Sequence, residues 1–185
     1  MNPEEFIKFL NQKSKAVENY ARNKFPRKAG EISLRFIDKN FQDQGWHGQT
    51  FQPWQPIKRK GTILVKTGTL RRGNYFTVEG ISAHVKNNVK YAAAHNNGFN
   101  GIVKVRAHTR RIISATKHPT GRTYKGGKRQ MQTIHGIEKN IFVKSFERNV
   151  NLPRRQFFPN SWDDSPVLVK QLQTQIFNDL KTIVK

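Results

Sequence analysis

The carboxylates that could carry catalysis are few and widely spaced. A catalytic centre needs a nucleophile with a base, a pair of carboxylates or a metal cluster. Glu31 and Asp38 would lie two turns apart on one helix, which is the pattern of a solvated helix face rather than of general acid/base work. We therefore expect no enzymatic activity from this pair.

Cysteine and histidine give little support for a metal site. The chain has no cysteine, which excludes disulfides and thiolate chemistry. Its histidines show neither HxxxH nor HxH spacing, so zinc binding has little support. They are His47, His84, His95, His108, His118 and His135. We expect no metal and no cofactor.

Three other features have both a functional and a structural interpretation. The segment YKGGK (124–128) invites comparison with phosphate-binding glycine loops, but GxxxxGK[ST] is absent and the tip of a hairpin is the better interpretation. His95 follows three alanines, and we favour a histidine hydrogen-bonded inside a packed turn over a functional one. Trp46 and Trp54 could stack on bases, yet such tryptophans more often anchor an ordered loop to the core or to a neighbouring subunit.

Positive charge is the strongest signal in the sequence. Lys and Arg number 34 against 12 Asp and Glu in 185 residues, a formal net charge of +22. Such an excess indicates nucleic acid, an acidic protein surface or an anionic membrane as partner. No acid occurs between Glu79 and Glu138. This stretch contains the residues that we predict to contact nucleic acid or an acidic partner: Lys104, Arg106, Arg110, Arg111, Lys117, Arg122, Lys125, Lys128 and Arg129.

The basic stretch has three interpretations. A charged surface that only keeps the protein in solution is disfavoured, because nearly sixty consecutive residues contain no Asp or Glu. As a nucleic-acid element it would grip phosphates without reading sequence, since no base-reading helix is evident. As an assembly arm it would lie along an acidic neighbour. The last two are compatible, and we favour contact with protein.

Hydrophobic spacing predicts helices at both ends of one domain. Residues 3–25 and 27–41 show helical periodicity, with Pro26 expected to end the first helix and Gly30 weakening the second. Residues 165–185 form the clearest helix, with Ser165 as N-cap. No apolar run of about 20 residues is present, so we expect no segment that spans a bilayer, and we predict no membrane partner. Two acids near the N-terminus argue against a signal peptide.

The middle of the chain predicts loops and strands. Residues 42–61 have the composition of an ordered loop with aromatic anchors, and 91–95 suit a helical turn. Short strands are expected in this order: 63–65, 74–78 and 81–85, the last two as a tight hairpin. A longer hairpin, with strands at 102–115 and 129–146 around HPTGRTYKGG, would project on the order of 45 Å. We thus predict an α+β fold: N-terminal helices and a C-terminal helix on a small antiparallel sheet, with a projecting basic arm.

Four stretches in order resemble a known family. They are DQGWHGQTFQPWQPIK (43–58), ILVKTGTLRRG (63–73), VKYAAAHNNG (89–98) and LPRRQFFPNS (152–161). Together they are similar to the phage virion-morphogenesis family, the tail-completion and head-tail joining proteins. The matching positions are Trp46, Trp54, Leu64, Thr67, Gly68, Leu70, Arg71, Tyr91, Ala92, His95, Gly98, Pro153, Arg154, Phe157 and Phe158. Departures are Gln156, Asn74 and a longer, more basic insertion at 99–150.

The resemblance implies a structural virion protein. Residues 1–185 would form one virion-morphogenesis domain with the basic arm inserted at about 99–150. The domain would build a homo-oligomeric ring, a hexamer or dodecamer, in the neck or at the head-proximal end of the tail, assembled in the host cytoplasm. Its partners would be portal or connector and tail-tube proteins, with double-stranded DNA as a further contact. The alternative is a sequence-nonspecific nucleic-acid-binding protein that uses the basic arm.

Overall fold

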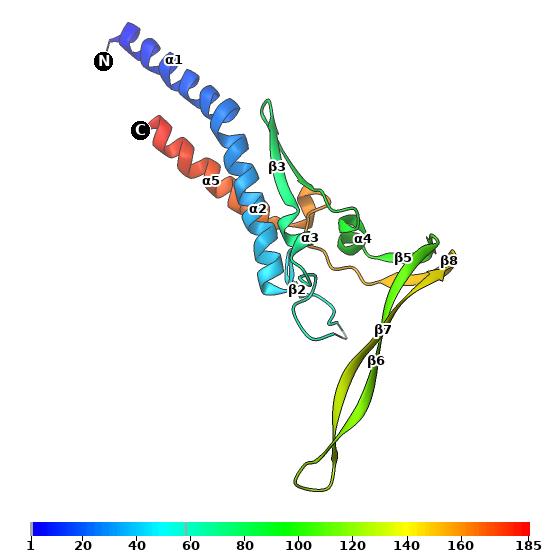
Figure 1. The fold of residues 1–185 in the computed structure, drawn as a ribbon. Helices are drawn as coiled ribbons and strands as arrows, with labels where there is room; N and C mark the ends of the chain where they lie inside the picture. Colours follow the sequence, from blue (N-terminus) through cyan, green and yellow to red (C-terminus); the bar gives the residue numbers. More distant parts are fainter. Residues whose placement is uncertain (1, 58) are drawn as a thin grey trace. The chain divides into compact units, whose positions relative to one another are not determined.

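The chain is an α+β protein (Figure 1). The computed structural model describes residues 2–57 and 59–185, without the side chains of residues 114–118, 133–135, 137 and 162. In chain order the elements are α1 (Pro3–Asn19), η1 (Tyr20–Lys24), α2 (Phe25–Asp43), β1 (Gly45–His47), β2 (Phe51–Pro53), α3 (Thr69–Arg72), β3 (Asn74–Glu79), β4 (Ser82–Asn87), α4 (Ala92–Asn97), β5 (Phe99–Val105), β6 (His108–Thr123), β7 (Arg129–Val143), β8 (Phe146–Leu152), η2 (Trp162–Asp164) and α5 (Pro166–Val184).

Two compact units make up the chain. The body comprises Met1–Phe99 and Asn151–Lys185, and the hairpin unit comprises Asn100–Val150. All four sheets are two-stranded, pairing β1 with β2, β3 with β4, β5 with β8 and β6 with β7. The core lies in the body and consists of Ile32, Phe36, Ile37, Phe41, Trp46, Trp54, Leu70, Ala92, Phe157, Leu168 and Leu172.

The N-terminal helices run on without the break predicted at Pro26. Asn2 caps α1 by accepting hydrogen bonds from the backbone N–H groups of Glu4 and Glu5, at 2.8 and 3.1 Å. The chain then widens into the π-helical turn η1, and Pro26 follows within the first turn of α2. Proline lacks the N–H that an α-helix requires at an interior position, but a first turn leaves that donor free. The prediction that Pro26 ends the helix was therefore wrong.

Gly30 allows α2 to approach β3 closely. A Cβ at Gly30 would lie 2.4 Å from Cδ2 of Phe76, which is closer than real contacts allow. The glycine that weakened the sequence-based prediction of this helix is thus needed for its packing on the sheet. The room that the missing side chain leaves for Phe76 is more important for stability here than the poor helix propensity of glycine.

We expect Gly30→Ala to lower the free energy of unfolding by about 1–3 kcal/mol, because overpacking outweighs the ~1 kcal/mol that alanine adds to an exposed helix. Urea unfolding measures the change. In a Phe76→Ala background the same substitution should cost much less, since the obstructing ring is gone. A stabilisation of about 1 kcal/mol in the native background would contradict close packing at this position.

Asp179 of α5 holds the N-terminal helices. Lys28 donates to both of its carboxylate oxygens at 2.8 Å, and the hydroxyl of Tyr20 donates at 2.7 Å. The hydrogen bonds from Lys28, with further ones from Gln175 and Tyr20, lower the pKa of Asp179 to about 2. Burial, together with Asp179, raises the pKa of Tyr20. Because the pKa of Asp179 is lower in the folded chain than in an unfolded one, the charged carboxylate stabilises the fold.

Asp179→Asn should destabilise the chain near neutral pH by about 1–2 kcal/mol, because it removes a charged acceptor that solvent screens only in part. The difference in free energy of unfolding between the native chain and the variant should be complete above the ordinary pKa of 3.8. It should disappear as pH falls towards 2, where Asp179 becomes protonated. Urea unfolding of both proteins across this range measures it. A difference that is unchanged down to pH 2 would show that the carboxylate charge is not responsible.

The shorter elements agree with the sequence in part. The β3–β4 hairpin and α4 were predicted, and the structure confirms both, with Gly80 in the two-residue turn at φ 60°. The strand expected at 63–65 was wrong. Those residues form a turn in which Leu64 has φ 58° and the N–H of Ile63 donates to Oε1 of Gln44 at 2.6 Å. A side-chain acceptor therefore takes the place of a partner strand.

The strands of the hairpin unit are divided differently from the prediction. In place of two continuous strands there are four, with breaks at 106–107 and 144–145. At the first break, the ring of His108 donates from Nδ1 to the carbonyl oxygen of Arg106 at 3.0 Å, which takes that carbonyl out of a strand ladder. The strands also continue through 118–123, which was predicted as turn, with a register shift between Pro119 and Thr123. That the arm projects from the body stays a prediction.

Candidate functional site: the motif cluster and the basic hairpin

Much of the family-like sequence lies in the core of the body. Trp46, Trp54, Leu70 and Phe157 are buried, and the three aromatic rings among them each pack against a phenylalanine of α2. The ring of Phe41 lies 5.0 Å from that of Phe157 and 5.5 Å from that of Trp54. The prediction that the two tryptophans anchor the stretch 42–61 to the core is confirmed, but the stretch is not a loop throughout, because it contains the short β1–β2 hairpin. Phe51, from the same stretch, is instead about half exposed.

Two buried asparagines fix the segment that contains Phe157. Asn40 donates to the carbonyl oxygen of Phe157 at 3.1 Å, and its own oxygen accepts from the backbone N–H of His47 at 3.2 Å. Asn96 accepts from the backbone N–H groups of Phe157 and Phe158 at 3.0 and 2.8 Å. Sequence reasoning missed both side chains, because an asparagine inside a helix pattern carries no sign of such long-range partners.

Gly68, Gly98 and Arg71 have structural explanations. Gly68 and Gly98 have φ of 76° and 77°, and a Cβ at Gly98 would lie 3.1 Å from the backbone nitrogen of Arg154. Arg71 donates to both carboxylate oxygens of Asp38, from Nη2 at 2.8 Å. Asp38 was predicted to lie on a solvated face, but this pairing lowers its pKa and ties α3 to α2. Arg154 donates within its own segment, to Gln156.

His95 is not the hydrogen-bonded histidine that the sequence suggested. Its Nδ1 is buried, and among the described residues no hydrogen-bond partner reaches it. Burial, and then the charge of Arg155, lower the pKa of His95. The ring packs edge-on against Tyr91 with centroids 5.7 Å apart. The prediction of a satisfied histidine in a packed turn was therefore wrong about the hydrogen bond.

Leu64, Thr67, Tyr91 and His95 of the motifs line one pocket of the body. It has a volume of about 310 Å³. Its walls combine motif residues with three cations, Arg59, Lys66 and Arg155, which were not predicted as site residues. The lining consists of Ile57, Arg59, Leu64, Lys66, Thr67, Leu70, Tyr91, His95 and Arg155. Pro153 is half-buried in the segment before Arg155.

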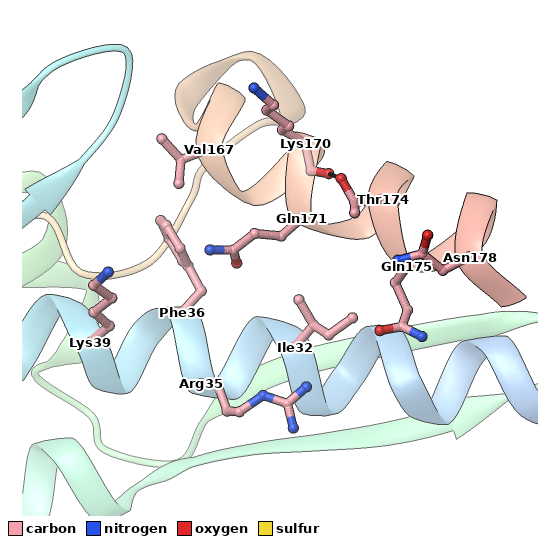
Figure 2. Close-up of a pocket in the computed structure, with 10 residues that line it drawn as sticks. All are labelled: Ile32, Arg35, Phe36, Lys39, Val167, Lys170, Gln171, Thr174, Gln175 and Asn178. Atoms are coloured by element: carbon pink, nitrogen blue, oxygen red, sulfur yellow. Dashed lines mark hydrogen bonds between the residues drawn. The ribbon is translucent and has the colours of Figure 1, made fainter.

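A second hollow is an open groove between α2 and α5 (Figure 2). Ile32 and Phe36 supply its apolar part, and Lys39 and Lys170 lie along it. Its volume is about 580 Å³. None of its lining residues is a carboxylate, a cysteine or a histidine, so those residues supply neither a general acid or base nor a strong metal ligand.

The predicted basic contacts lie along the hairpin unit. This unit has twelve lysines and arginines against two glutamates. Lys104, Arg106, Arg110, Arg122, Lys125, Lys128 and Arg129 are all exposed. Arg111 is exposed but pairs with Glu138, and the side chain of Lys117 lies outside the described residues. The tip at 124–128 closes as a turn, in which the N–H of Tyr124 donates to the carbonyl of Lys128 at 2.9 Å.

Both faces of the β6–β7 hairpin mix charge with apolar groups. Opposite residues on paired strands share a face, so Arg110 shares one with Ile141. Phe142 lies opposite Thr109 on the other face, which also contains Arg111, two residues further along the strand. Ile141 and Phe142 are both exposed, Phe142 by 67%. No single face is therefore purely basic.

Four of the six histidines have side chains that the structure describes: His47, His84, His95 and His108. His47 lies 3.1 Å from Asp43 and His84 lies 3.8 Å from Glu79. Among the side chains that the structure describes, no three of the types that bind metals come together. None of the helices described within residues 2–57 and 59–185 is long and apolar enough to cross a bilayer. The side chains of His118 and His135 lie outside the described residues.

Comparison with known proteins gives no match: no protein family, no curated protein and no solved structure corresponds to this chain. The resemblance to the virion-morphogenesis family therefore rests on the four sequence stretches alone.

Proposed function

We propose that the chain is a structural subunit of a phage neck or head-proximal tail end, where it forms a homo-oligomeric ring that completes the tail and joins it to the head. The ring would have six or twelve copies. Its other partners would be connector and tail-tube proteins, with packaged DNA as a further contact. The family-like sequence motifs motivate this assignment, and the exposed surfaces of the structure support an assembly role.

The observation that carries the proposal is the apolar surface of α1. This helix is strongly amphipathic, yet none of its side chains is buried in the isolated chain. Phe6, Ile7 and Leu10 are 50%, 58% and 49% exposed. Phe177 of α5 is 67% exposed. Apolar residues concentrated in this way usually mark a protein interface. A monomer working in solution would have no use for such a surface.

The β6–β7 hairpin supports the same conclusion. Two strands alone are marginally stable in water, and in the described part of the chain neither strand has a second partner. Their outer edges present unpaired backbone N–H and C=O groups, which can pair with another chain. Exposed apolar residues on both faces would also be covered by a neighbour. An extended hairpin that lies on the next subunit explains these features together.

The second candidate function is sequence-nonspecific nucleic-acid binding. The exposed cations of the hairpin unit favour it, because they can neutralise phosphates without reading bases. It leaves the apolar surface of α1 unexplained. We therefore place DNA contact second to protein assembly.

The test is a phage population assembled without this chain. We expect filled heads and finished tails to accumulate separately, and chain supplied in trans to restore joined particles. Joined, infectious particles that form in its absence would overturn the proposal. Normal joining together with loss of DNA packaging or protection would instead favour the nucleic-acid-binding alternative.

A further inference from the structure

The pocket at His95 contains a buried arginine that lacks an anion. Arg155 is only 8% exposed. Its backbone N–H donates to the carbonyl of His95 at 2.9 Å, and its Nε donates to the carbonyl of Gln55 at 3.1 Å. Among the described residues, no carboxylate pairs with it and no acceptor reaches its two Nη groups. Burying an unpaired charge is costly, so a partner anion is expected.

A second polar group in the same wall is also without a partner. The buried Nδ1 of His95 finds no hydrogen-bond partner among the described residues, and His95 lines the same pocket as Arg155. An imidazole nitrogen can donate a hydrogen bond in the appropriate tautomer or when protonated. His95 and Arg155 therefore both bring to this pocket a polar group that lacks a partner among the described residues.

The rest of the lining matches an anion of high charge density. Arg59 and Lys66 add two more cations, Thr67 adds a hydroxyl, and the lining contains no acid. Arg59 is held in place by donating to the carbonyl of Thr62 at 2.7 Å. The about 310 Å³ of the pocket are ample for a tetrahedral oxyanion with its water. Several guanidinium and ammonium groups around one pocket are typical of phosphate recognition.

We propose that this pocket binds an oxyanion of the phosphate class, with Arg155 and His95 as the buried donors and Arg59 and Lys66 at the rim. The ligand is inorganic phosphate or the terminal phosphate of a small phosphomonoester. The site would stabilise the contact between the segments that carry Gln55, His95 and Arg155. It is independent of ring assembly, so either proposal can fail without the other.

The test is calorimetric titration of the full chain with inorganic phosphate and with a 5′-mononucleotide, at constant ionic strength set by chloride. Lys66→Gln removes a rim charge from an exposed residue and should preserve the fold. We expect it to weaken phosphate binding about 10-fold or more, as the loss of a charged hydrogen bond does. His95→Ala should weaken it similarly. The matched control is Lys86→Gln, an exposed lysine outside this lining, which should bind as the native chain does.

Tighter binding of the mononucleotide than of phosphate identifies a phosphomonoester as the ligand, and equal or weaker binding identifies inorganic phosphate. Two results overturn the proposal. The first is no heat of binding for either probe at millimolar concentration. The second is binding that Lys66→Gln and Lys86→Gln reduce equally, since this would show only general attraction to a basic surface. Arg155 is buried, and its replacement could disturb the fold, so neither result relies on a variant at that position.

Discussion

Replacing Phe6 and Leu10 of α1 with serine should weaken self-association of the chain by about 30-fold. The two side chains are 50% and 49% exposed, so an interface can still bury about half of each. Burying a full side chain of this size contributes about 1.5–3 kcal/mol, and half of two such side chains gives about 2 kcal/mol. That free energy corresponds to the stated change in dissociation constant. Sedimentation velocity over a range of concentrations measures it.

The matched control for the α1 surface is a variant with Asn11→Ser and Gln12→Ser. Both residues are exposed and polar, so the control changes the same helix without removing an apolar side chain. The control should assemble as the native chain does, and neither variant should change the free energy of unfolding by more than about 1 kcal/mol. Equal assembly of the two variants would show that the apolar surface of α1 has no interface role.

Changing Arg106, Arg110 and Arg111 to glutamine should abolish assembly with the neighbouring virion proteins while the chain stays folded. All three are exposed, and only Arg111 has an acidic partner, Glu138, among the described residues. Exposed ion pairs contribute at most about 1 kcal/mol, so the fold should tolerate the change. If the hairpin also grips DNA, three lost phosphate contacts should reduce the slope of log K against log salt by about 2.7. Co-sedimentation and filter binding give the two readouts.

The control for charge itself carries Lys8→Gln, Lys15→Gln and Arg27→Gln. These exposed residues lie in the body, so the control loses the same charge outside the hairpin. It should keep its partners. If both variants lose assembly equally, total charge rather than the hairpin is responsible. If only DNA binding is lost and assembly persists, the hairpin contacts phosphate and our preference for a protein contact is wrong.

Local signals explain the parts of the fold that the sequence predicted well. Ser165 caps α5 by accepting a hydrogen bond from the backbone N–H of Leu168 at 3.2 Å. A serine N-cap followed by a proline in the first turn is a common start of a helix. The β3–β4 hairpin follows from alternating residues around a glycine turn. In these elements the determining residues are neighbours in sequence, and their chemistry is visible without tertiary contacts.

Long-range partners explain what the sequence could not predict. The residues 63–65 have strand composition, but Gln44 satisfies the backbone of Ile63 and a turn results. Asn40 and Asn96 reach a segment far along the chain, and no spacing rule marks them. The cations of the His95 pocket come from one loop, with Arg59 and Lys66, and from Arg155 far along the chain, and they meet only after folding. The sequence predicted the apolar face of α1, but only the structure shows that no other part of the chain buries this face.

The most direct test of the structural role is electron cryomicroscopy of the intact virion with this chain located in the density. Our account predicts a closed ring of six or twelve copies at the head-proximal end of the tail. In that ring the apolar surface of α1 and the β6–β7 hairpin would both be buried against neighbours. A virion whose head–tail junction contains no copy of the chain, with the purified chain remaining monomeric, would contradict it.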